Sequence, residues 1–178
     1  LWESMLAVAK LGAVVMPTTG ALGSADLADR IIAYALESGQ WSEVPPKGRD
    51  IVLAATPLIS ERLVTLAEAL PKLQFLFVGD DELTINPAAV AKLKDNAGEV
   101  LSVAADVLGQ LEQWNAELIH EALSTALVGG MELKPKFAFA PIRVAITGEQ
   151  VSPPLFESMA ILGRDSSLSR LTALRGSL

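Results

Sequence analysis

The chain has 178 residues, 51% of them hydrophobic and 20% charged, which is the composition of a folded globular protein and excludes a disordered or fibrous one. It has no cysteine, so disulfides and thiolate metal sites are excluded and a cytoplasmic location is expected. The net charge of −7 disfavours nucleic acid, but residues 134–178 hold 6 Lys/Arg against 3 Asp/Glu, so any contact with a polyanion is expected there.

Residues 1–23 are predicted to form a leader that differs from the rest of the chain. LWESMLAVAK, residues 1–10, has the spacing of a helix, and AVVMP, residues 13–17, has the composition of a strand that its proline closes. The charged side chains of Glu3 and Lys10 interrupt the apolar run, which falls short of the ~20 residues that a membrane span needs. No membrane segment is therefore predicted.

From Ser24 onward, apolar residues recur at helical spacing almost throughout, with caps and breakers between the runs. Pro57 is expected to kink or split one long run just before Leu58. The predicted helices span residues 24–39, 45–70, 87–96, 97–114, 115–130, 141–148, 153–163 and 165–175. Their N-caps are expected at Ser24, Asn86, Ser152 and Asp165.

This pattern predicts an all-α fold, a helical bundle of two packed subdomains in which the helices cover one another's apolar faces. An acidic turn, GDDEL at residues 79–83, separates two groups of predicted helices. The expected domains are therefore the leader at 1–23, a first helical subdomain at 24–82 and a second at 83–178.

The chain is poorly supplied with catalytic residues. His120 is its only histidine and shares a predicted helix with Glu117 and Glu121, which favours a partly exposed helical histidine over a metal ligand or a triad member. The acidic residues 80–82 lack the alternate spacing of a calcium loop and are predicted to form a solvated turn. No catalytic residue, metal site or bound cofactor is expected in this chain.

Arg62 and Arg143 are the strongest candidates for function. Each is a long cation within a mainly apolar helical segment, TPLISERLVTL and APIRVAITG, where a purely structural role needs a buried carboxylate partner. Glu61 does not serve Arg62, because neighbours in a helix point about 100° apart. An arginine that snorkels at a helix surface explains such a residue equally well on these observations alone.

Ser152 and Pro153 add a second feature near Arg143. A Ser-Pro helix start exposes backbone N–H groups and the positive end of the helix dipole, which suits a base edge or a phosphate. Many helices begin in this way without a ligand, so both alternatives stay open.

Five motifs between residues 26 and 178 point to a known family. They are DLADRI, PLISERLVTL, FLFVGDDELTI, KDNAGEVL and, the most specific, LKPKFAFAPIRVAITGEQVSPPLFESMAILGRDSSLSRL. In these motifs the chain resembles the C-terminal, anticodon-binding region of bacterial glutamyl-tRNA synthetases, especially those of actinobacterial type. That region consists of two all-helical domains that bind the anticodon loop.

The resemblance implies roles for particular residues. It matches Arg62 to the arginine that reads the third anticodon base, a cytosine, and Arg143 to the arginine at the first anticodon base. The pocket around the first base is matched by Ser152, Pro153 and Leu155. Contacts with the tRNA backbone are expected from Lys134, Lys136 and Arg164.

The resemblance also implies that the catalytic centre lies outside this chain, which is then inactive by itself as a ligase. In the family an upstream Rossmann-type domain uses ATP and magnesium and carries a His-x-Gly-His signature, which a chain whose only histidine is His120 cannot contain. Ser124 and Thr125 stand where some members have a further anticodon-contacting arginine, so that contact is not expected. The expected partner is tRNA(Glu), without DNA or a membrane, and the expected state is a monomer.

Residues 1–31, LWESMLAVAKLGAVVMPTTGALGSADLADRI, resemble instead a segment of AMP-forming acyl-CoA synthetases, a helix that leads into a core strand. The phosphate loop of those enzymes does not follow, so acyl adenylation is not expected. The chain is thus a tRNA-binding module, a remnant of an acyl-CoA ligase, or a helical protein-interaction module. Salt-sensitive binding of tRNA(Glu), affinity for ATP or an acyl-adenylate, or neither property separates the three.

Overall fold

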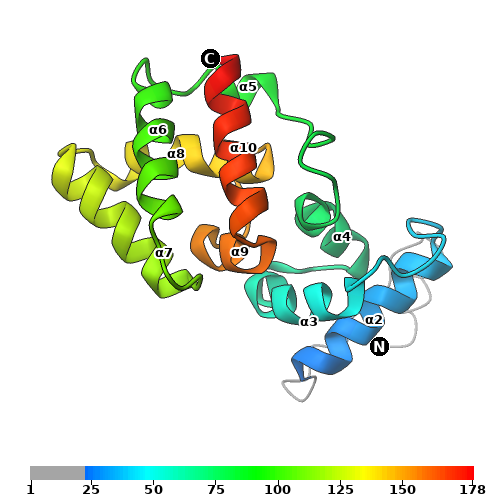
Figure 1. Cartoon of the computed structure of the whole chain (residues 1–178). Coiled ribbons are helices and arrows are strands. Elements are labelled where there is room, and N and C mark those ends of the chain that lie inside the picture. Colours follow the sequence, from blue (N-terminus) through cyan, green and yellow to red (C-terminus); the bar gives the residue numbers. More distant parts are fainter. Residues whose placement is uncertain (1–22) are drawn as a thin grey trace. The chain divides into compact units, whose positions relative to one another are not determined.

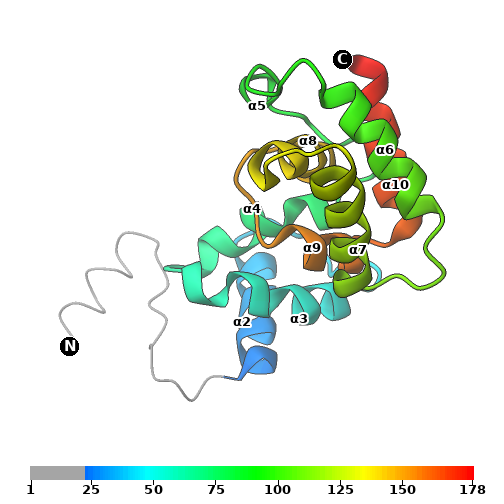
Figure 2. The ribbon, with the colours of Figure 1, turned by 90° about the vertical axis from the view of Figure 1, so that its left-hand side faces the viewer.

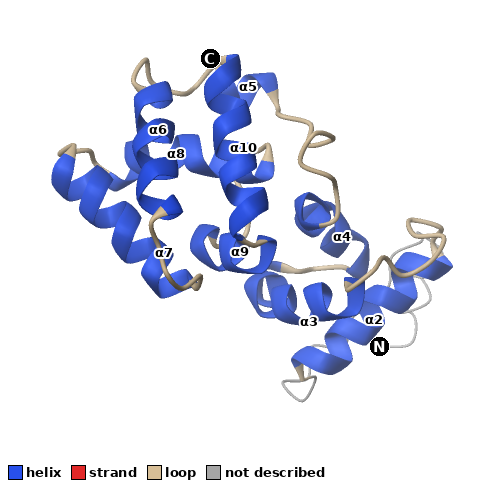
Figure 3. Cartoon of the chain, viewed as in Figure 1, coloured by secondary structure: helices blue, strands red, loops and turns tan. Residues whose placement is uncertain are grey.

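The computed structural model describes residues 23–178 (Figure 1), and the predicted helix and strand of the leader, over residues 1–17, lie outside this range. In the described range the chain forms helices and no strand (Figure 3), so the predicted all-α class is confirmed. None of the helices there combines the length and the apolar character that crossing a membrane requires. The chain divides into two compact units, Leu1–Phe77 and Val78–Leu178, and the subdomain boundary expected after residue 82 stays a prediction.

The described part of the first unit is built on α2 (Ser24–Glu37), α3 (Gly48–Ile59) and α4 (Ala69–Leu73). Short 3-10 turns lie at Ser60–Arg62, Leu66–Glu68 and Gln74–Leu76. α2 packs against α3 through a buried stripe at helical spacing, formed by Leu27, Ala28, Ile31 and Ala35. The core of this unit is completed by Val52, Ala55, Ile59, Leu70 and Leu73.

In the first unit the predicted cap of α2 is wrong, and the predicted break at Pro57 lies two residues too early. α2 is capped by Gly23 rather than Ser24, because Gly23 has the extended backbone of a cap and its carbonyl accepts the first helical bond, from the Leu27 N–H at 3.1 Å. α3 runs through Pro57 and ends at Ile59, beyond the predicted break. A proline removes a single backbone donor, and here the helix tolerates that loss for two further residues.

The second unit contains α5 (Pro87–Val90), α6 (Ala97–Gly109), α7 (Ala116–Leu123), α8 (Pro135–Thr147), α9 (Leu155–Leu162) and α10 (Arg164–Ser177). A π-helical segment, Ser124–Gly130, continues α7 to the two glycines that were expected to end it. α6 and α10 lie side by side, and α8 crosses both of them (Figure 1). These three helices bury Val100, Leu101, Ala104, Leu108, Ile142, Ile146, Leu171 and Leu174.

Asparagine side chains cap two helices of the second unit. Asn86 Oδ1 accepts from the Ala88 N–H at 2.9 Å, which confirms the predicted cap of α5. Asn115 Oδ1 accepts from the Leu118 N–H at 2.9 Å and caps α7 in the same way. α5 ends after 4 residues, however, well before its predicted end at residue 96.

Ser152 and Asp165 do not cap helices, contrary to the sequence prediction. α9 begins after Pro154, because the Ser152 hydroxyl is engaged by Arg143 and does not reach the helix N–H groups. α10 begins after Gly163, whose φ of 94° strongly favours glycine. Asp165 instead lies in the first turn of α10, where its charge is favourable to the helix dipole.

Arg170 of α10 is 2% exposed and fastens the start of the second unit to its core. Its Nε donates to Asp80 Oδ1 at 2.7 Å, its Nη1 to the Ile146 carbonyl at 2.9 Å and its Nη2 to the Val78 carbonyl at 3.0 Å. Arg170 is therefore not available to a polyanion. Residues 80–82 form the predicted turn, in which Asp81 and Glu82 are exposed, but Asp80 is half-buried and belongs to an ion pair. The sequence did not predict this ion pair, which a buried guanidinium requires.

Candidate functional site

Arg143 lies near the C-terminal end of α8 and contacts the loop that joins α8 to α9. Its Nη1 donates to Ser152 Oγ at 2.6 Å and to the Pro153 carbonyl at 3.1 Å. Gly148 ends α8 in the left-handed conformation, with φ of 78°, and so turns the chain back toward Arg143. The structure thus brings together three of the residues that the sequence placed in one site.

The remaining wall of this site is apolar. Pro153 is buried, and Leu155, the first residue of α9, is 3% exposed. Leu155 therefore supports the loop from the interior, and its side chain offers almost no surface to a ligand. The polar surface consists of the half-buried Arg143 guanidinium, the Ser152 hydroxyl and the backbone groups at the start of α9.

Gly148 makes the closest backbone approach at the site. A Cβ atom added to it would lie 2.4 Å from the Thr84 carbonyl oxygen. The Asn86 N–H donates to the Gly148 carbonyl at 2.9 Å, so the two backbone segments are in direct contact. Together with the positive φ, this contact leaves room for glycine alone.

Arg62 lies on the surface of the first unit, in the 3-10 turn that follows α3, and not within a long helix as predicted. The chain leaves the α-helical conformation after Ile59, which turns Arg62 outward. No carboxylate of residues 23–178 forms an ion pair with it. Val64 is 75% exposed, so an apolar side chain accompanies this cation at the surface.

The three predicted backbone contacts differ in exposure. Lys134 and Lys136, at the start of α8, are exposed. Arg164 is half-buried, donates to the Leu111 carbonyl and lies 5.7 Å from the centre of the Trp114 ring. A phosphate contact at Arg164 therefore competes with two interactions inside the protein.

Two lysines in the segment before α6, which no sequence pattern singled out, contact α8 and the loop that follows it. Lys94 Nζ lies 5.3 Å from the ring centre of Phe137, next to Lys136. Lys92 Nζ donates to Gln150 Oε1 at 3.2 Å, two residues before Ser152 in the loop. No motif or periodicity marks these pairs, because their members stand far apart in the sequence.

His120 is exposed on α7, and its ring packs against Phe156 with ring centres 4.5 Å apart. In the part of the chain that the structure describes, no three His, Cys, Asp or Glu side chains are grouped to hold a metal ion. His120 is thus an aromatic neighbour of α9.

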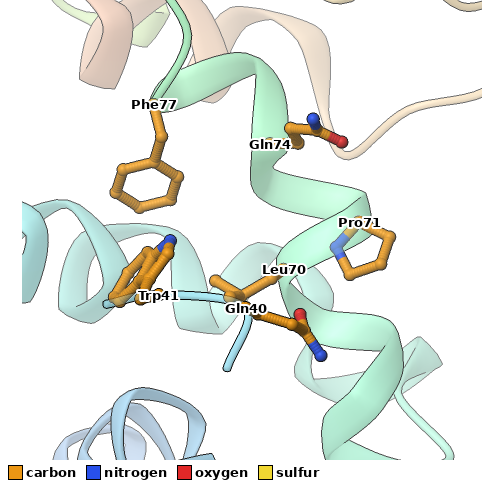
Figure 4. A pocket seen from close by; sticks show the side chains of 6 residues that line it. All are labelled: Gln40, Trp41, Leu70, Pro71, Gln74 and Phe77. Atoms are coloured by element: carbon orange, nitrogen blue, oxygen red, sulfur yellow. The ribbon is translucent and has the colours of Figure 1, made fainter. Parts of the chain in front are cut away.

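A separate pocket of about 260 Å³ lies in the first unit (Figure 4). It opens between α4 and the loop after α2 and is lined by Gln40, Trp41, Leu70, Pro71, Gln74 and Phe77. Trp41 and Phe77 meet edge to face, with ring centres 5.0 Å apart. The pocket is smaller than the roughly 300 Å³ at which ligand sites usually begin, and none of the predicted site residues lines it.

Comparison with known proteins gives a consistent result. The family model described as "Anticodon binding domain" matches residues 26–175. The chain is 46% identical over 154 residues to the glutamate–tRNA ligase of Kocuria rhizophila, which covers 86% of this chain and 30% of that protein. It is 42% identical over 172 residues to the glutamate–tRNA ligase of Kineococcus radiotolerans, which covers 96% of this chain and 34% of that protein.

A solved structure is similar to the chain as well. The crystal structure of a glutamate tRNA ligase from Elizabethkingia meningosepticum matches with a TM-score of 0.73 and 18% identity, over 88% of this chain and 30% of that one. At this identity the likeness shows a shared fold alone. The chain spans about a third of the length of the curated relatives that it matches.

Proposed function

Because this chain belongs to the anticodon-binding domain family, we propose that it recognises the anticodon of tRNA(Glu) as the C-terminal part of a glutamate–tRNA ligase. The family match over residues 26–175 and the glutamate–tRNA ligases among the relatives support this proposal. The main structural support for a site is the pair of hydrogen bonds from Arg143 to Ser152 and to the Pro153 carbonyl.

The chemistry of this site suits an unpaired base. A guanidinium presents five N–H donors in a planar fork, and an unpaired base exposes carbonyl and ring-nitrogen acceptors on its edges. The bonds from Arg143 to Ser152 and to the Pro153 carbonyl hold that fork in place before a base arrives. The Ser152 hydroxyl accepts from Arg143 and donates to the Pro153 carbonyl at 2.9 Å, which leaves its oxygen one further lone pair as an acceptor for a base N–H.

For the third anticodon base the proposal assigns Arg62. Its exposure on a turn leaves the guanidinium accessible to RNA, and the exposed Val64 offers apolar contact to a base face. Lys134 and Lys136 are exposed and suit the RNA backbone, whereas Arg164 must first give up its contacts with Leu111 and Trp114.

Aminoacylation itself is proposed to take place in a part of the parent enzyme outside this chain, together with its ATP and magnesium. The coverage of about 30% of the Kocuria relative supports this division. On this proposal the chain binds tRNA as a cytoplasmic monomer and needs no cofactor to do so.

Two origins of the leader lead to different expectations. Its resemblance to acyl-CoA synthetases stays a prediction. The match with the Kineococcus ligase covers 96% of this chain. The uncovered part is smaller than the leader before Gly23, so the match includes part of the leader, which favours a ligase origin. Binding of ATP or an acyl-adenylate to this chain, measured by calorimetry, would speak for the acyl-CoA synthetase origin instead.

Arg143→Gln is expected to weaken binding of tRNA(Glu) by about 1 to 3 kcal/mol, because the fork that contacts the base is lost. Its unfolding free energy should fall by about 1 to 2 kcal/mol, the value of the two hydrogen bonds that are lost. Filter binding at low salt, run beside urea unfolding, measures both quantities. Arg175→Gln is the matched control, since Arg175 is an exposed arginine of the same unit.

A loss of about 3 kcal/mol or more in stability, with affinity lowered only in proportion to the unfolded fraction, would contradict the role of Arg143. That outcome is the one expected of an arginine that neutralises a buried carboxylate. If Arg143→Gln and the control weaken binding equally, Arg143 contributes only its positive charge and makes no specific contact with a base.

Arg62→Gln is expected to reduce discrimination against a tRNA with a purine at the third anticodon position by about 1 to 3 kcal/mol, because a base contact carries sequence information. The salt dependence of binding should change little. Affinities of transcripts that differ only at that position, measured between low and physiological salt, give both values.

Arg30→Gln serves as the control for Arg62, since Arg30 is an exposed arginine of the same unit. If Arg62 contacts a phosphate instead, all transcripts weaken alike and the salt slope falls by about one unit. Unchanged binding would show that Arg62 has no role in RNA binding and is a surface arginine that snorkels along its own segment.

A further inference from the structure

The loop that carries Ser152 is held from its other side by Asn86, which lies some sixty residues earlier in the sequence. The backbone N–H of Asn86 donates to the Gly148 carbonyl at 2.9 Å. Its side-chain Nδ2 donates to the two carboxylate oxygens of Glu149 at 3.0 and 3.3 Å. Asn86 is thus hydrogen-bonded to Gly148 and Glu149, the first two residues after α8.

The next loop residue, Gln150, is gripped in a similar way. Its Nε2 donates to the Ala89 carbonyl at 3.4 Å, and its Oε1 accepts from Lys92 Nζ at 3.2 Å. Ala89 belongs to α5, which packs against α8 (Figure 2). Three consecutive loop residues are therefore bonded to the segment 86–92, which we term the splint.

The splint and Arg143 hold the loop at two neighbouring points. Val151, between the gripped Gln150 and Ser152, is 85% exposed and contributes little packing of its own. The bonds on either side of Val151 therefore hold Ser152 in place, together with the packing of the buried Pro153 and Leu155. A loop fixed in this way loses little conformational freedom when a ligand binds, which favours affinity.

We propose that Asn86 is a positioning residue for anticodon recognition, which acts through Glu149 to keep Ser152 and Pro153 at Arg143 before RNA binds. This inference rests on the proposed function of the Arg143 site. Asn86 itself does not touch the base; it sets the place of the groups that do.

The two roles of the Asn86 side chain are separable. Its Oδ1 caps α5 through the Ala88 N–H, whereas its Nδ2 binds Glu149. A serine caps a helix as asparagine does but is too short to reach Glu149 at the same time. Asn86→Ser therefore removes the splint contact while it keeps the cap and the net charge.

The experiment measures affinity for a tRNA(Glu) transcript and unfolding by urea in the whole 178-residue chain. Asn86→Ser is expected to weaken tRNA binding roughly three- to tenfold, the cost of ordering a side chain or two on binding. Its matched control is Asn115→Ser, at the asparagine cap of α7 in the same unit, which should leave affinity unchanged. Both variants should lose a similar, small amount of stability.

A reversed pair supplies the rescue. In Asn86→Asp combined with Glu149→Gln, donor and acceptor change places, while the cap and the net charge are kept. This double variant is expected to bind tRNA more tightly than Asn86→Ser and close to the native chain, because residues in contact compensate for each other rather than act additively.

Equal affinities of the two serine variants, or a reversed pair no better than Asn86→Ser, would overturn the positioning role. Arg143→Gln, measured in parallel, separates this failure from failure of the proposed function. If Arg143→Gln weakens binding and Asn86→Ser does not, the positioning role alone is wrong. If neither weakens binding, the proposed site is wrong and the positioning role falls with it.

Discussion

Arg170→Met is expected to lower the free energy of unfolding by about 3 to 5 kcal/mol, the cost of removing one partner of a buried ion pair. Methionine retains most of the apolar volume but none of the donors. It leaves Asp80 and the Ile146 and Val78 carbonyls without the guanidinium that serves all three. Because the Asp80 side chain is 30% exposed and can rehydrate, the loss should lie nearer the lower value.

Urea unfolding at pH 7 measures this loss, provided that the dependence on denaturant is unchanged. Arg49→Met is the control, since Arg49 pairs with Asp29 where the two side chains are 57% and 56% exposed. Such a surface pair contributes about 0 to 1 kcal/mol. A loss at Arg170 no larger than that at Arg49 would show that water or another side chain replaces the buried guanidinium.

Gly148→Ala is the second large expected effect, a loss of about 2 to 5 kcal/mol. The left-handed conformation costs a residue with a Cβ about 1 to 2 kcal/mol. The contact with the Thr84 carbonyl at 2.4 Å adds the cost of overpacking, about 1 to 3 kcal/mol. The neighbour is backbone, which is itself tied down by the bond from Asn86 to Gly148, so it yields less readily than a side chain.

Gly39→Ala separates the two contributions. Gly39 has φ of 72° but no atom within 4 Å of an added Cβ, so its substitution carries the conformational cost alone. The difference between the two variants in urea unfolding is the cost of the contact. Equal losses would mean that residues 84–86 move aside, in which case Gly148→Ala should also weaken tRNA binding by releasing the loop.

Local patterns sufficed to predict the helical class and one of the four expected caps, because periodicity and caps are properties of a few neighbouring residues. Asn86 illustrates this, since its cap acts on a residue two positions away. Ser152 illustrates the limit, because its hydroxyl serves Arg143, nine residues earlier, and no local rule weighs that bond against a cap. The break predicted at Pro57 occurs two residues later, at the end of α3, because the proline removes only one backbone donor from the helix.

The candidate site was only partly accessible to sequence reasoning. The break at Gly148 placed Arg143 near Ser152, and the family resemblance supplied the role. The burial of individual side chains could not be predicted from the sequence. Leu155 was therefore expected to line the base pocket, although its side chain is almost wholly covered. The splint was not accessible either, because Asn86 and Glu149 become neighbours only when α5 packs against α8.

The ion pair between Asp80 and Arg170 joins residues 90 positions apart, and this separation bears on how the chain folds during translation. The core of the second unit is incomplete until α10 emerges from the ribosome, since Arg170, Leu171 and Leu174 all come from it. The first unit ends at Phe77 and does not have to wait for that helix. Contacts of such long range also slow folding relative to a bundle with local contacts only. We therefore expect the first unit to fold while the second is still being synthesised.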